Sequence, residues 1–431
     1  MENFGSPNSS LTALICPSRM KPNQSVLLQT LKPAVIVGAL GYFVDVYDLI
    51  LFTMVRIPSL KELGFTGDAL VSNGAFLLNA QMIGMLVGGI FFGILGDRLG
   101  RVALLFSSIL IYSIANIANG LVHSIEAYAI WRFIAGFGLS GELGGCITLV
   151  SEILPQTLRG YGTTIISTVG VFGAVVGGWV ATQVHWTTAY FIGGGLGLVL
   201  LVLRLSVAES GMFKHLRSAS HGVSRGNFLM LFTDAGRLMK YLRCILIGFP
   251  LWCIVGVLVA FSPEIAQSLK ISGPVIPTKS IPWCYWGITL GGFASGFLSQ
   301  QFRSRRKILF AFLILTALAL VGYFSTAGQS NYVFYWSILA LGFGVGYWTI
   351  FVTVAAEQFG TNIRATVATT VPNFVRGTTV LFTFSFAWLK PQIGTIHAAA
   401  LVSFASILIA LWAVFGLRET YDTNLDYVEP L

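Results

Sequence analysis

Five charged side chains lie well inside long apolar stretches of this chain: Asp45, Asp48, Arg132, Glu142 and Arg376. An ionised carboxylate in a hydrocarbon environment costs on the order of 3 kcal/mol on insertion scales, and more in simulations. Asp45 and Asp48 stand three residues apart and therefore share one face of a helix. Such a face is stable only where it meets water, protons or a basic partner. These residues predict a route for protons or polar solutes across a membrane.

Arg132 is a candidate partner for the two aspartates. Arg132 lies about six residues inside its segment, counted from the outer end, which is a depth of ~9 Å at 1.5 Å per residue. A carboxylate beside Arg stays ionised, whereas one separated from Arg in an apolar cavity takes up a proton. A pair that forms and breaks during movement would couple protons to that movement. We therefore predict that Asp45 or Asp48 carries the proton; a fixed structural ion pair and direct substrate contact are the alternatives.

Glu142 and Arg376 extend this set. Glu142 lies ten residues beyond Arg132, ~15 Å further along the same helix, and is predicted as a second titrating group; a neutral acid buried among glycines is the alternative. Arg376 keeps its proton and must meet an anion. The guanidinium fork suits a substrate carboxylate or phosphate, and pairing with an acid of the first half of the chain is the alternative.

Polar and aromatic side chains near these charges are further candidates for substrate contact. Interfacial aromatic belts and ordinary helix packing are the alternative explanation for such residues. The predicted substrate-binding set, besides Arg376, is Asn373, Tyr347, Trp348, Gln81 and Trp286.

The composition is that of a protein with many membrane spans. Of 431 residues, 55% are hydrophobic and 10% are charged, against about 25% charged in soluble domains; the mean hydropathy is +0.79. The net charge of +9 follows the predicted topology and does not indicate nucleic-acid binding. The five cysteines have no CxxC or metal-like spacing, so neither a disulfide framework nor a metal site is expected.

Twelve apolar segments of about twenty residues can be drawn, and none alternates as a barrel strand would. Residues 1–30 form a predicted cytosolic tail, 31–207 and 243–417 two sets of six helices, 208–242 a cytosolic loop, and 418–431 a second cytosolic tail. With both termini inside, 19 Lys and Arg fall on the cytosolic side and five outside, as the positive-inside rule requires. The segments are 31–55, 70–95, 102–122, 127–150, 160–184, 188–207, 243–263, 281–300, 308–327, 332–356, 365–389 and 395–417.

The two halves of the chain repeat each other at an offset of 205 residues. Two separate motifs share that offset, which is improbable by chance. Parallel repeats of six helices are typical of transporters whose site lies between the halves, near the midplane. The matched residues are Glu152 with Glu357, Arg159 with Arg364, Arg98 with Arg303, and Arg101 with Arg306.

One of these motifs, GILGDRLGR at 93–101, follows the second segment. Gly96 and Gly100 permit a tight turn, and Asp97, Arg98 and Arg101 can make charge-assisted bonds to neighbouring helix ends. Ordinary positive-inside loop chemistry is the alternative for this stretch taken alone.

Together with its weaker copy at 300–306, this stretch resembles the signature loop of the major facilitator superfamily. WRFIAGFG at 131–138 resembles that family's fourth-helix motif, and EILPQTLRG at 152–160 its loop between helices four and five. GYFVDVYDLILF at 41–52 and SGELGG at 140–145 look like the first and fourth helices of metabolite–proton and phosphate–proton symporters. The resemblance covers about 31–417 and implies an all-α membrane protein with twelve helices in two pseudo-symmetric bundles.

The second copy of the signature loop departs from the family pattern. Gln301 and Phe302 replace the Gly-Asp pair. A gate latch in this half must therefore use Arg303, Arg305 or Arg306 differently, or be missing. The predicted gating motif of the two halves comprises Gly96, Asp97, Arg98, Gly100, Arg101, Glu152, Arg159, Arg303, Arg306, Glu357 and Arg364.

The expected function is transport without an enzymatic step. The chain has no GxxxxGK[ST] loop and no nucleophile or dehydrogenase constellation, so we expect no cofactor and an ion gradient as the energy source. The predicted protein is a monomer of the inner or plasma membrane that takes up a small hydrophilic, anionic metabolite with protons by rocking its two bundles. Export of drugs or siderophores is the main alternative, favoured by a mostly apolar cavity with Arg376 paired internally. A transporter-like receptor is the remote one.

Overall fold

The computed structural model describes residues 30–207, 209–212 and 226–430. Within these ranges the chain is helical and contains no strand, only an isolated bridge between Ser272 and Ser330. The predicted N-terminal tail lies almost entirely outside the described residues, as does much of the predicted central loop. The all-helical fold class is confirmed.

The helices of the first half follow the predicted segments with shifts of a few residues. In a bilayer every backbone N–H and C=O needs a partner inside the segment, which makes long apolar stretches helical. They are α2 (Pro33–Glu62), α3 (Asp68–Leu99), α4 (Arg101–Asn119), α5 (Ile125–Leu139), α6 (Glu142–Ile153), α7 (Gln156–Gln183), α8 (Trp186–Leu203) and the short 3₁₀ helix η1 (Arg204–Ser206).

The second half begins earlier than predicted. Residues 235–242, assigned to the central loop from sequence, are helical because Asp234 caps them by accepting from Arg237 N. The elements are η2 (Phe228–Phe232), α10 (Ala235–Ile247), α11 (Phe249–Cys253), η3 (Ile254–Val259), α12 (Ser262–Ser268), α13 (Pro277–Gln301), α14 (Arg305–Phe324), α15 (Asn331–Val345), α16 (Trp348–Glu357), α17 (Arg364–Gly377), α18 (Thr379–Ile393) and α19 (Thr395–Phe415).

Ten helices in the described ranges are long and apolar enough to cross a membrane. The predicted segments 281–300 and 365–389, which are not among these ten, are also helical. They correspond to α13 and to the consecutive helices α17 and α18.

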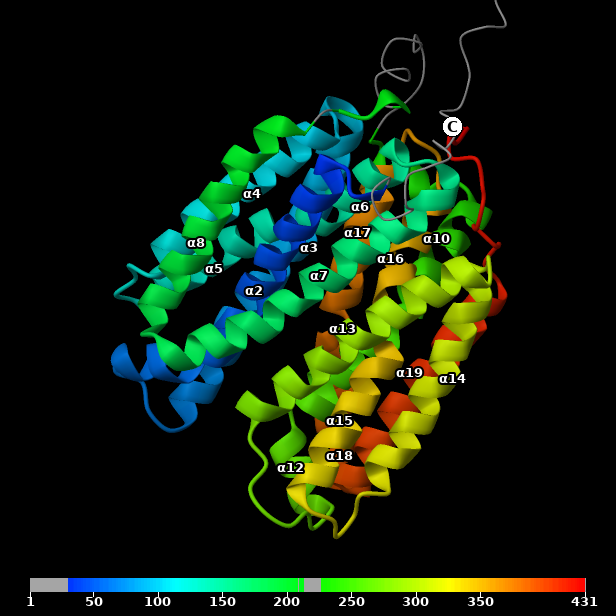
Figure 1. The fold of residues 1–431 in the computed structure, drawn as a ribbon. Coiled ribbons are helices and arrows are strands. Elements are labelled where there is room, and N and C mark those ends of the chain that lie inside the picture. Colours follow the sequence, from blue (N-terminus) through cyan, green and yellow to red (C-terminus); the bar gives the residue numbers. More distant parts are fainter. Residues whose placement is uncertain (1–29, 208, 213–225, 431) are drawn as a thin grey trace, which may run out of the picture.

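The elements form two bundles that lie side by side (Figure 1). Helices α2 to α8 make up one bundle and α10 to α19 the other. The bundles meet where α17 packs against α3 and α6 and where α13 packs against α7. We call the end of the molecule that carries residues 96–101, 152–159, 303–306 and 357–364 the motif end; it is the predicted cytosolic end.

Glycines allow the helices within each bundle to cross closely. A Cβ at Gly84 of α3 would lie 2.1 Å from Phe133 O of α5, and one at Gly287 of α13 would lie 2.1 Å from Leu339 O of α15. These are equivalent crossings in the two halves, so the repeat seen in the motifs extends to the packing. Small residues at helix crossings are the usual means of close approach in membranes.

Two of the predicted segments are broken near their middle. α5 gives way to α6 at Ser140 and Gly141, and α15 gives way to α16 at Gly346 and Tyr347. The two breaks are 206 residues apart (346 − 140 = 206), within one residue of the offset of the motifs. Interrupted helices near the midplane are where transporter folds place polar sites, and Glu142 and Trp348 open the second pieces.

Candidate functional site

Asp45 and Arg376 meet between the bundles. Asp45, on α2, is fully buried, and its Oδ2 lies 3.8 Å from Nη2 of Arg376, on α17. Neither carboxylate oxygen of Asp45 accepts a hydrogen bond from any described residue, and Nε of Arg376 donates none. Nη1 of Arg376 donates to Asn373 Oδ1 at 3.2 Å. The structure thus places Arg376 against an acid of the first half, which was the alternative to substrate contact.

A small cavity lies beside this pair, between the bundles. Its volume is about 20 Å³, which is room for a single water molecule. In this arrangement of the halves no metabolite fits there. Both bundles contribute to the lining, which consists of Tyr42, Val46, Leu49, Val171, Leu251, Trp252, Tyr285, Ile288, Trp348 and Arg376.

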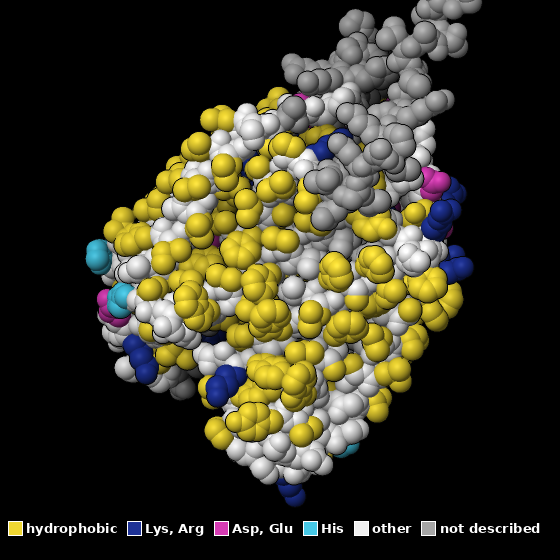
Figure 2. Space-filling view, viewed as in Figure 1, with side chains coloured by type: hydrophobic (Ala, Val, Ile, Leu, Met, Phe, Trp, Pro, Cys, Tyr) yellow, Lys and Arg dark blue, Asp and Glu magenta, His cyan; other side chains and the backbone are white. Residues whose placement is uncertain are grey.

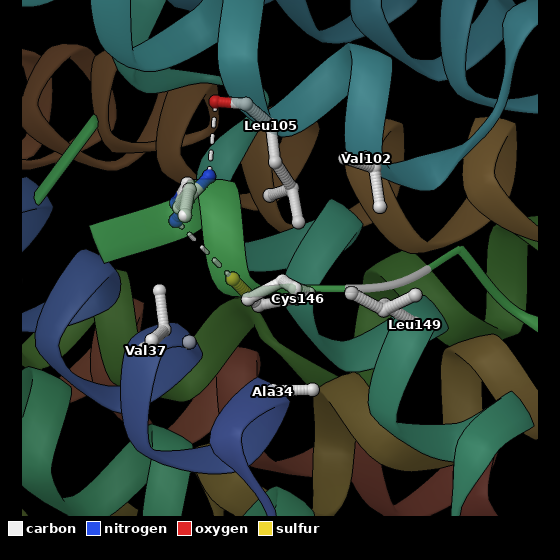
Figure 3. Close-up of a pocket in the computed structure, with 9 residues that line it drawn as sticks. Ala34, Val37, Val102, Leu105, Cys146 and Leu149 are labelled. Carbon is white, nitrogen blue, oxygen red and sulfur yellow. Dashed lines mark hydrogen bonds between the residues drawn. The ribbon is translucent and has the colours of Figure 1, made fainter. Parts of the chain in front are cut away.

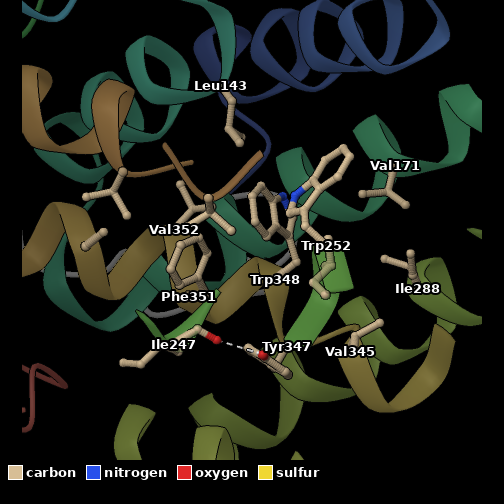
Figure 4. Packing of buried hydrophobic residues seen from close by; sticks show 14 of the residues in the cluster. Leu143, Val171, Ile247, Trp252, Ile288, Val345, Tyr347, Trp348, Phe351 and Val352 are labelled. Carbon is tan, nitrogen blue, oxygen red and sulfur yellow. Dashed lines mark hydrogen bonds between the residues drawn. The ribbon is translucent and has the colours of Figure 1, made fainter. Parts of the chain in front are cut away.

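Aromatic side chains close the cavity. Trp348 Nε1 donates to the hydroxyl of Tyr42 at 3.0 Å and so links the two bundles. Figure 4 shows Trp252 and Trp348 together, between Val171 and Phe351. Nε1 of Trp252 donates to no described residue although the side chain is buried. Sequence reasoning named Trp348 for the site but not Tyr42 or Trp252, whose signals are those of ordinary apolar packing.

The other predicted substrate-binding residues lie apart from the cavity lining. Tyr347 points away from it and donates its hydroxyl to Ile247 O at 2.8 Å (Figure 4). Trp286 is 43% exposed and packs edge-on against Phe172 of α7, with ring centroids 5.1 Å apart.

Asn373 and Gln81 are both buried and hydrogen-bonded. The amide of Asn373 donates to Ser140 O at 2.9 Å and so ties α17 to the break between α5 and α6. Gln81, on α3, accepts from Nη2 of Arg132.

Arg132 and Asp48 have separate partners. Arg132 binds Gln81 and its guanidinium lies 4.5 Å from the ring centroid of Phe52, while Nε and Nη1 find no acceptor among the described residues. Asp48 accepts from the amide of Asn116 on α4. No ion pair joins Arg132 to either aspartate in the described part of the chain, so the pairing that the depths suggested is absent from this arrangement.

Glu142 has a basic partner that the sequence analysis missed. This partner is Arg204 of η1, which is 2% exposed and pairs with Glu142 Oε1. From the sequence, Arg204 was counted with the cytosolic cations. Its Nη1 also donates to Leu105 O at 2.9 Å. Its Nη2 also donates to Sγ of Cys146 at 3.8 Å, and Figure 3 shows Leu105 and Cys146 bonded in this way beside a hollow of about 10 Å³. The only sequence signal for this pair was Glu142 itself, a buried acid without an obvious partner in its own helix.

At the motif end, Asp97 of α3 joins the first bundle to the second. Its carboxylate accepts from Ala365 N at 3.1 Å, Thr366 N at 2.8 Å and Thr366 Oγ1 at 2.7 Å, all at the start of α17. A carboxylate at a helix N-terminus both satisfies free N–H groups and complements the helix dipole. Asp97 therefore binds across the bundles as a helix cap.

Glu152 forms a second connection across the bundles. Its Oε1 lies 2.8 Å from Arg101 and 3.0 Å from Arg364 of α17. Arg101 also donates to Thr361 O at 2.9 Å, and Arg159 to Ser151 O at 2.7 Å. All four charged side chains are buried. Glu152, Arg101 and Arg364 thus form one network of predicted gating residues, and Arg159 binds the backbone next to Glu152.

The glycines and the remaining arginine of the first motif lie around this network. Gly100, with φ of +114°, precedes α4 in a conformation that favours glycine. A Cβ at Gly96 would lie 3.1 Å from Ala365 Cβ. Arg98 is exposed at the end of α3.

In the second half, Arg305 occupies the position expected for Arg306. Arg305 is buried and lies 3.5 Å from Glu357 Oε1, whereas Nη2 of Arg306 donates to Phe415 O at 2.8 Å near the surface. Arg303 is exposed, with φ of +48°. The structure thus pairs Arg305, and not Arg306, with Glu357, and it leaves the predicted Arg303 and Arg306 outside this pair.

The C-terminal segment 418–430 also lies across the motif end, which no sequence motif indicated. Its carbonyl groups accept from both bundles: Leu425 O from Thr361 Oγ1 at 3.1 Å, and Thr423 O from Nη1 of Arg159 at 3.4 Å. Leu425 is fully buried. The segment therefore bridges α7 of the first bundle and the start of α17.

Comparisons with known proteins agree with this architecture. Residues 38–377 match the model of the Major Facilitator Superfamily. The chain is 26% identical to the niacin transporter NiaP of Acinetobacter baylyi, over 76% of this chain and 80% of that protein, and 26% identical to the cis,cis-muconate transport protein of the same organism, over 78% and 82%.

Among solved structures, the proton:xylose symporter XylE superposes with a TM-score of 0.75 at 15% identity, covering 93% of this chain and 98% of XylE. At that identity the likeness concerns the fold. The family match, which spans well over half of the chain, carries the assignment: this chain belongs to the major facilitator superfamily and is a membrane transporter.

Proposed function

We propose that this transporter takes up a small organic anion together with protons, by alternating access between its two bundles. The observation that carries the proposal is the contact of Arg376 with Asp45 across the bundle interface, beside the central cavity. Asp45 belongs to the first bundle and Arg376 to the second. Their contact is therefore sensitive to any movement of one bundle against the other.

The geometry supports a competition between substrate and Asp45 for one guanidinium. An entering carboxylate would bind Arg376 bidentately and displace Asp45, whose carboxylate accepts no hydrogen bond from the described residues. A buried carboxyl group without a partner is far costlier as an anion than as a neutral acid. Substrate binding and protonation of Asp45 would then favour each other.

The relatives are consistent with an anionic substrate. Niacin and cis,cis-muconate, which two of them are named for, both carry carboxyl groups. The aromatic lining of the cavity would pack on the flat face of such a molecule.

For this chain, the contacts at the motif end are proposed to form the closed cytosolic gate.

Uptake by proteoliposomes with an imposed proton gradient tests the coupling. We expect accumulation of a labelled carboxylate with the gradient, and loss of accumulation in Asp45→Asn with exchange of internal for external substrate retained. Glu62→Gln, an exposed acid far from the cavity, is the control and should accumulate normally. Uptake by the unaltered protein that is indifferent to the gradient would reject symport.

The role of Arg376 can be tested separately by thermal-shift measurements with a panel of metabolites. An anion that stabilises the protein should lose its effect in Arg376→Ala. An anion that stabilises this variant equally well would remove Arg376 from the substrate site.

Export of an apolar compound or a siderophore is the second candidate. One observation favours it: nine of the ten residues that line the cavity are aliphatic or aromatic, and Arg376 has an internal partner. Export predicts thermal stabilisation by lipophilic compounds that is equal in Arg376→Ala and the unaltered protein. It also predicts substrate release from loaded vesicles against its gradient.

A further inference from the structure

We infer that the start of α14 and the end of α19 form a binding site for the phosphate headgroup of an anionic phospholipid. A hollow of about 530 Å³ lies there at the motif end. It is lined by Phe302, Arg303, Ser304, Arg306, Lys307, Phe310, Val414, Phe415 and Glu419. The inference depends on the fold and is independent of the proposed transport reaction.

The cations of this hollow are not used by the gate. Arg305 alone of this run reaches Glu357. The side chains of Arg303 and Lys307 are exposed and form no hydrogen bond or ion pair with any described residue, and Arg306 reaches only a backbone carbonyl.

The position of the cations is unfavourable for the helix itself. Arg305, Arg306 and Lys307 are the first three residues of α14, where the helix dipole disfavours positive charge. Arg305 has Glu357 as its partner, so Arg306 and Lys307 are the cations of this turn that still call for a negative group.

Glu419 is the acid nearest to this turn, and its carboxylate is already occupied. It accepts from the hydroxyl of Ser304, from Arg305 N at 2.9 Å and from Arg306 N at 3.2 Å. These bonds satisfy the free N–H groups at the start of α14 and leave Arg303 and Lys307 without a counterion in the described chain.

The hollow has the amphipathic shape of a lipid. Phe302 is 63% exposed and Phe415 61% exposed. The helices α14 and α19 expose further apolar side chains, among them Leu318 at 63%, Leu408 at 66% and Trp412 at 53%. Figure 2 shows Lys and Arg side chains gathered at this edge of the molecule, above a hydrophobic surface.

A phospholipid matches both parts of this surface. Its phosphate would lie between Arg303 and Lys307, and its acyl chains along the phenyl rings. Basic pockets at the ends of membrane helices are known to bind anionic headgroups. A soluble phosphate would match the cations but leave the aromatic part of the hollow uncovered.

Native mass spectrometry of the full chain from nanodiscs measures the occupancy. The probe is phosphatidylglycerol in a phosphatidylcholine background, with Arg303→Gln/Lys307→Gln as the test variant. We expect retained phosphatidylglycerol to fall roughly 5-fold per charge removed. Arg303→Lys/Lys307→Arg should retain the lipid, and Lys61→Gln/Lys279→Gln, with two exposed cations distant from the hollow, is the control.

Three outcomes would overturn the inference: equal occupancy in the test variant, an equal fall in the control, or millimolar inorganic phosphate that displaces phosphatidylglycerol and binds as well without it. The last result would identify a site for soluble phosphate. Since Gln at position 303 meets the same left-handed backbone as Arg, the test variant adds no backbone strain of its own.

Discussion

The buried carboxylates of this transporter differ in whether their partners lie in the same bundle. Asp48 and Glu142 bind Asn116 and Arg204, which belong to the same bundle as the acids themselves. Asp45 alone of these three meets a residue of the other bundle, Arg376. A rocking movement leaves the first two contacts intact and changes the third. This separates a candidate for coupling from two contacts that support the bundle.

The pair of Glu142 and Arg204 is predicted to be structural. Removing one partner of a buried ion pair costs about 3–5 kcal/mol, whereas apolar residues in both places are often neutral. We expect Glu142→Leu and Arg204→Met each to lower the unfolding temperature in detergent, and the double variant to recover most of the loss. The double variant should also keep its response to a proton gradient; loss of that response would identify Glu142 as a titrating group.

The sequence predicts which charges are buried but not their partners. A carboxylate in an apolar segment can be identified from the sequence alone, and Asp45, Asp48 and Glu142 are all fully buried in the structure. The partner depends on how each helix is rotated and tilted. Arg204 lies near the end of the predicted segment 188–207 and was counted with the cytosolic cations, yet η1 places it in a buried contact with Glu142 of α6.

The residues at which α4 and α14 begin explain why Arg305, and not Arg306, pairs with Glu357. The offset of 205 residues holds for the two glutamates, and the breaks at Ser140 and Gly346 are 206 residues apart. α4 begins at Arg101, however, and α14 at Arg305, an offset of 204. One residue turns a helix by about 100°, so Arg306 points to the surface. Loop lengths of this kind are invisible to a comparison that assumes one offset.

The anchoring of the C-terminal segment 418–430 at the motif end is predicted to depend on pH through Glu419. Burial raises the pKa of this carboxyl, but hydrogen bonds from Ser304 and from the backbone N–H groups of Tyr421, Arg305 and Arg306 outweigh it, so the pKa lies below its ordinary value. The stabilisation is therefore complete above the unfolded pKa of about 4.3 and is lost as the pH falls through the lower folded value.

Hydrogen exchange of residues 418–430, corrected for intrinsic rates, measures this dependence. We expect protection to be constant from pH 7 to about pH 5 and to fall in more acidic solution. Glu419→Gln should exchange faster throughout, with a flatter profile. Asp422→Asn, an exposed acid that no described residue contacts through its carboxylate, should match the unaltered protein. Equal profiles for all three would remove Glu419 from the anchoring of this segment.

The arrangement of the two bundles is predictable only in part. Composition, the twelve segments and the repeat predict an all-helical transporter fold, and the family match confirms it. The end at which the bundles touch cannot be predicted in this way, because under the proposed alternating access one sequence would stabilise at least two arrangements. The structure shows contact at the motif end, through Asp97 and Glu152.

Close packing of Gly144 is predicted to stabilise this arrangement over the one with the motif end open. A Cβ at Gly144 of α6 would lie 2.4 Å from Thr369 Cα of α17, so Gly144→Ala must push the bundles apart there. Overpacking costs about 1–3 kcal/mol, which shifts a two-state equilibrium roughly 5- to 150-fold. Distances between spin labels at the exposed positions 99 and 302 should gain a longer population. Gly322→Ala, whose Cβ meets nothing within 4 Å, is the control and should leave these distances unchanged. An unchanged distance distribution in a folded Gly144→Ala protein would mean that the contact of Gly144 with Thr369 does not set the equilibrium between the two arrangements.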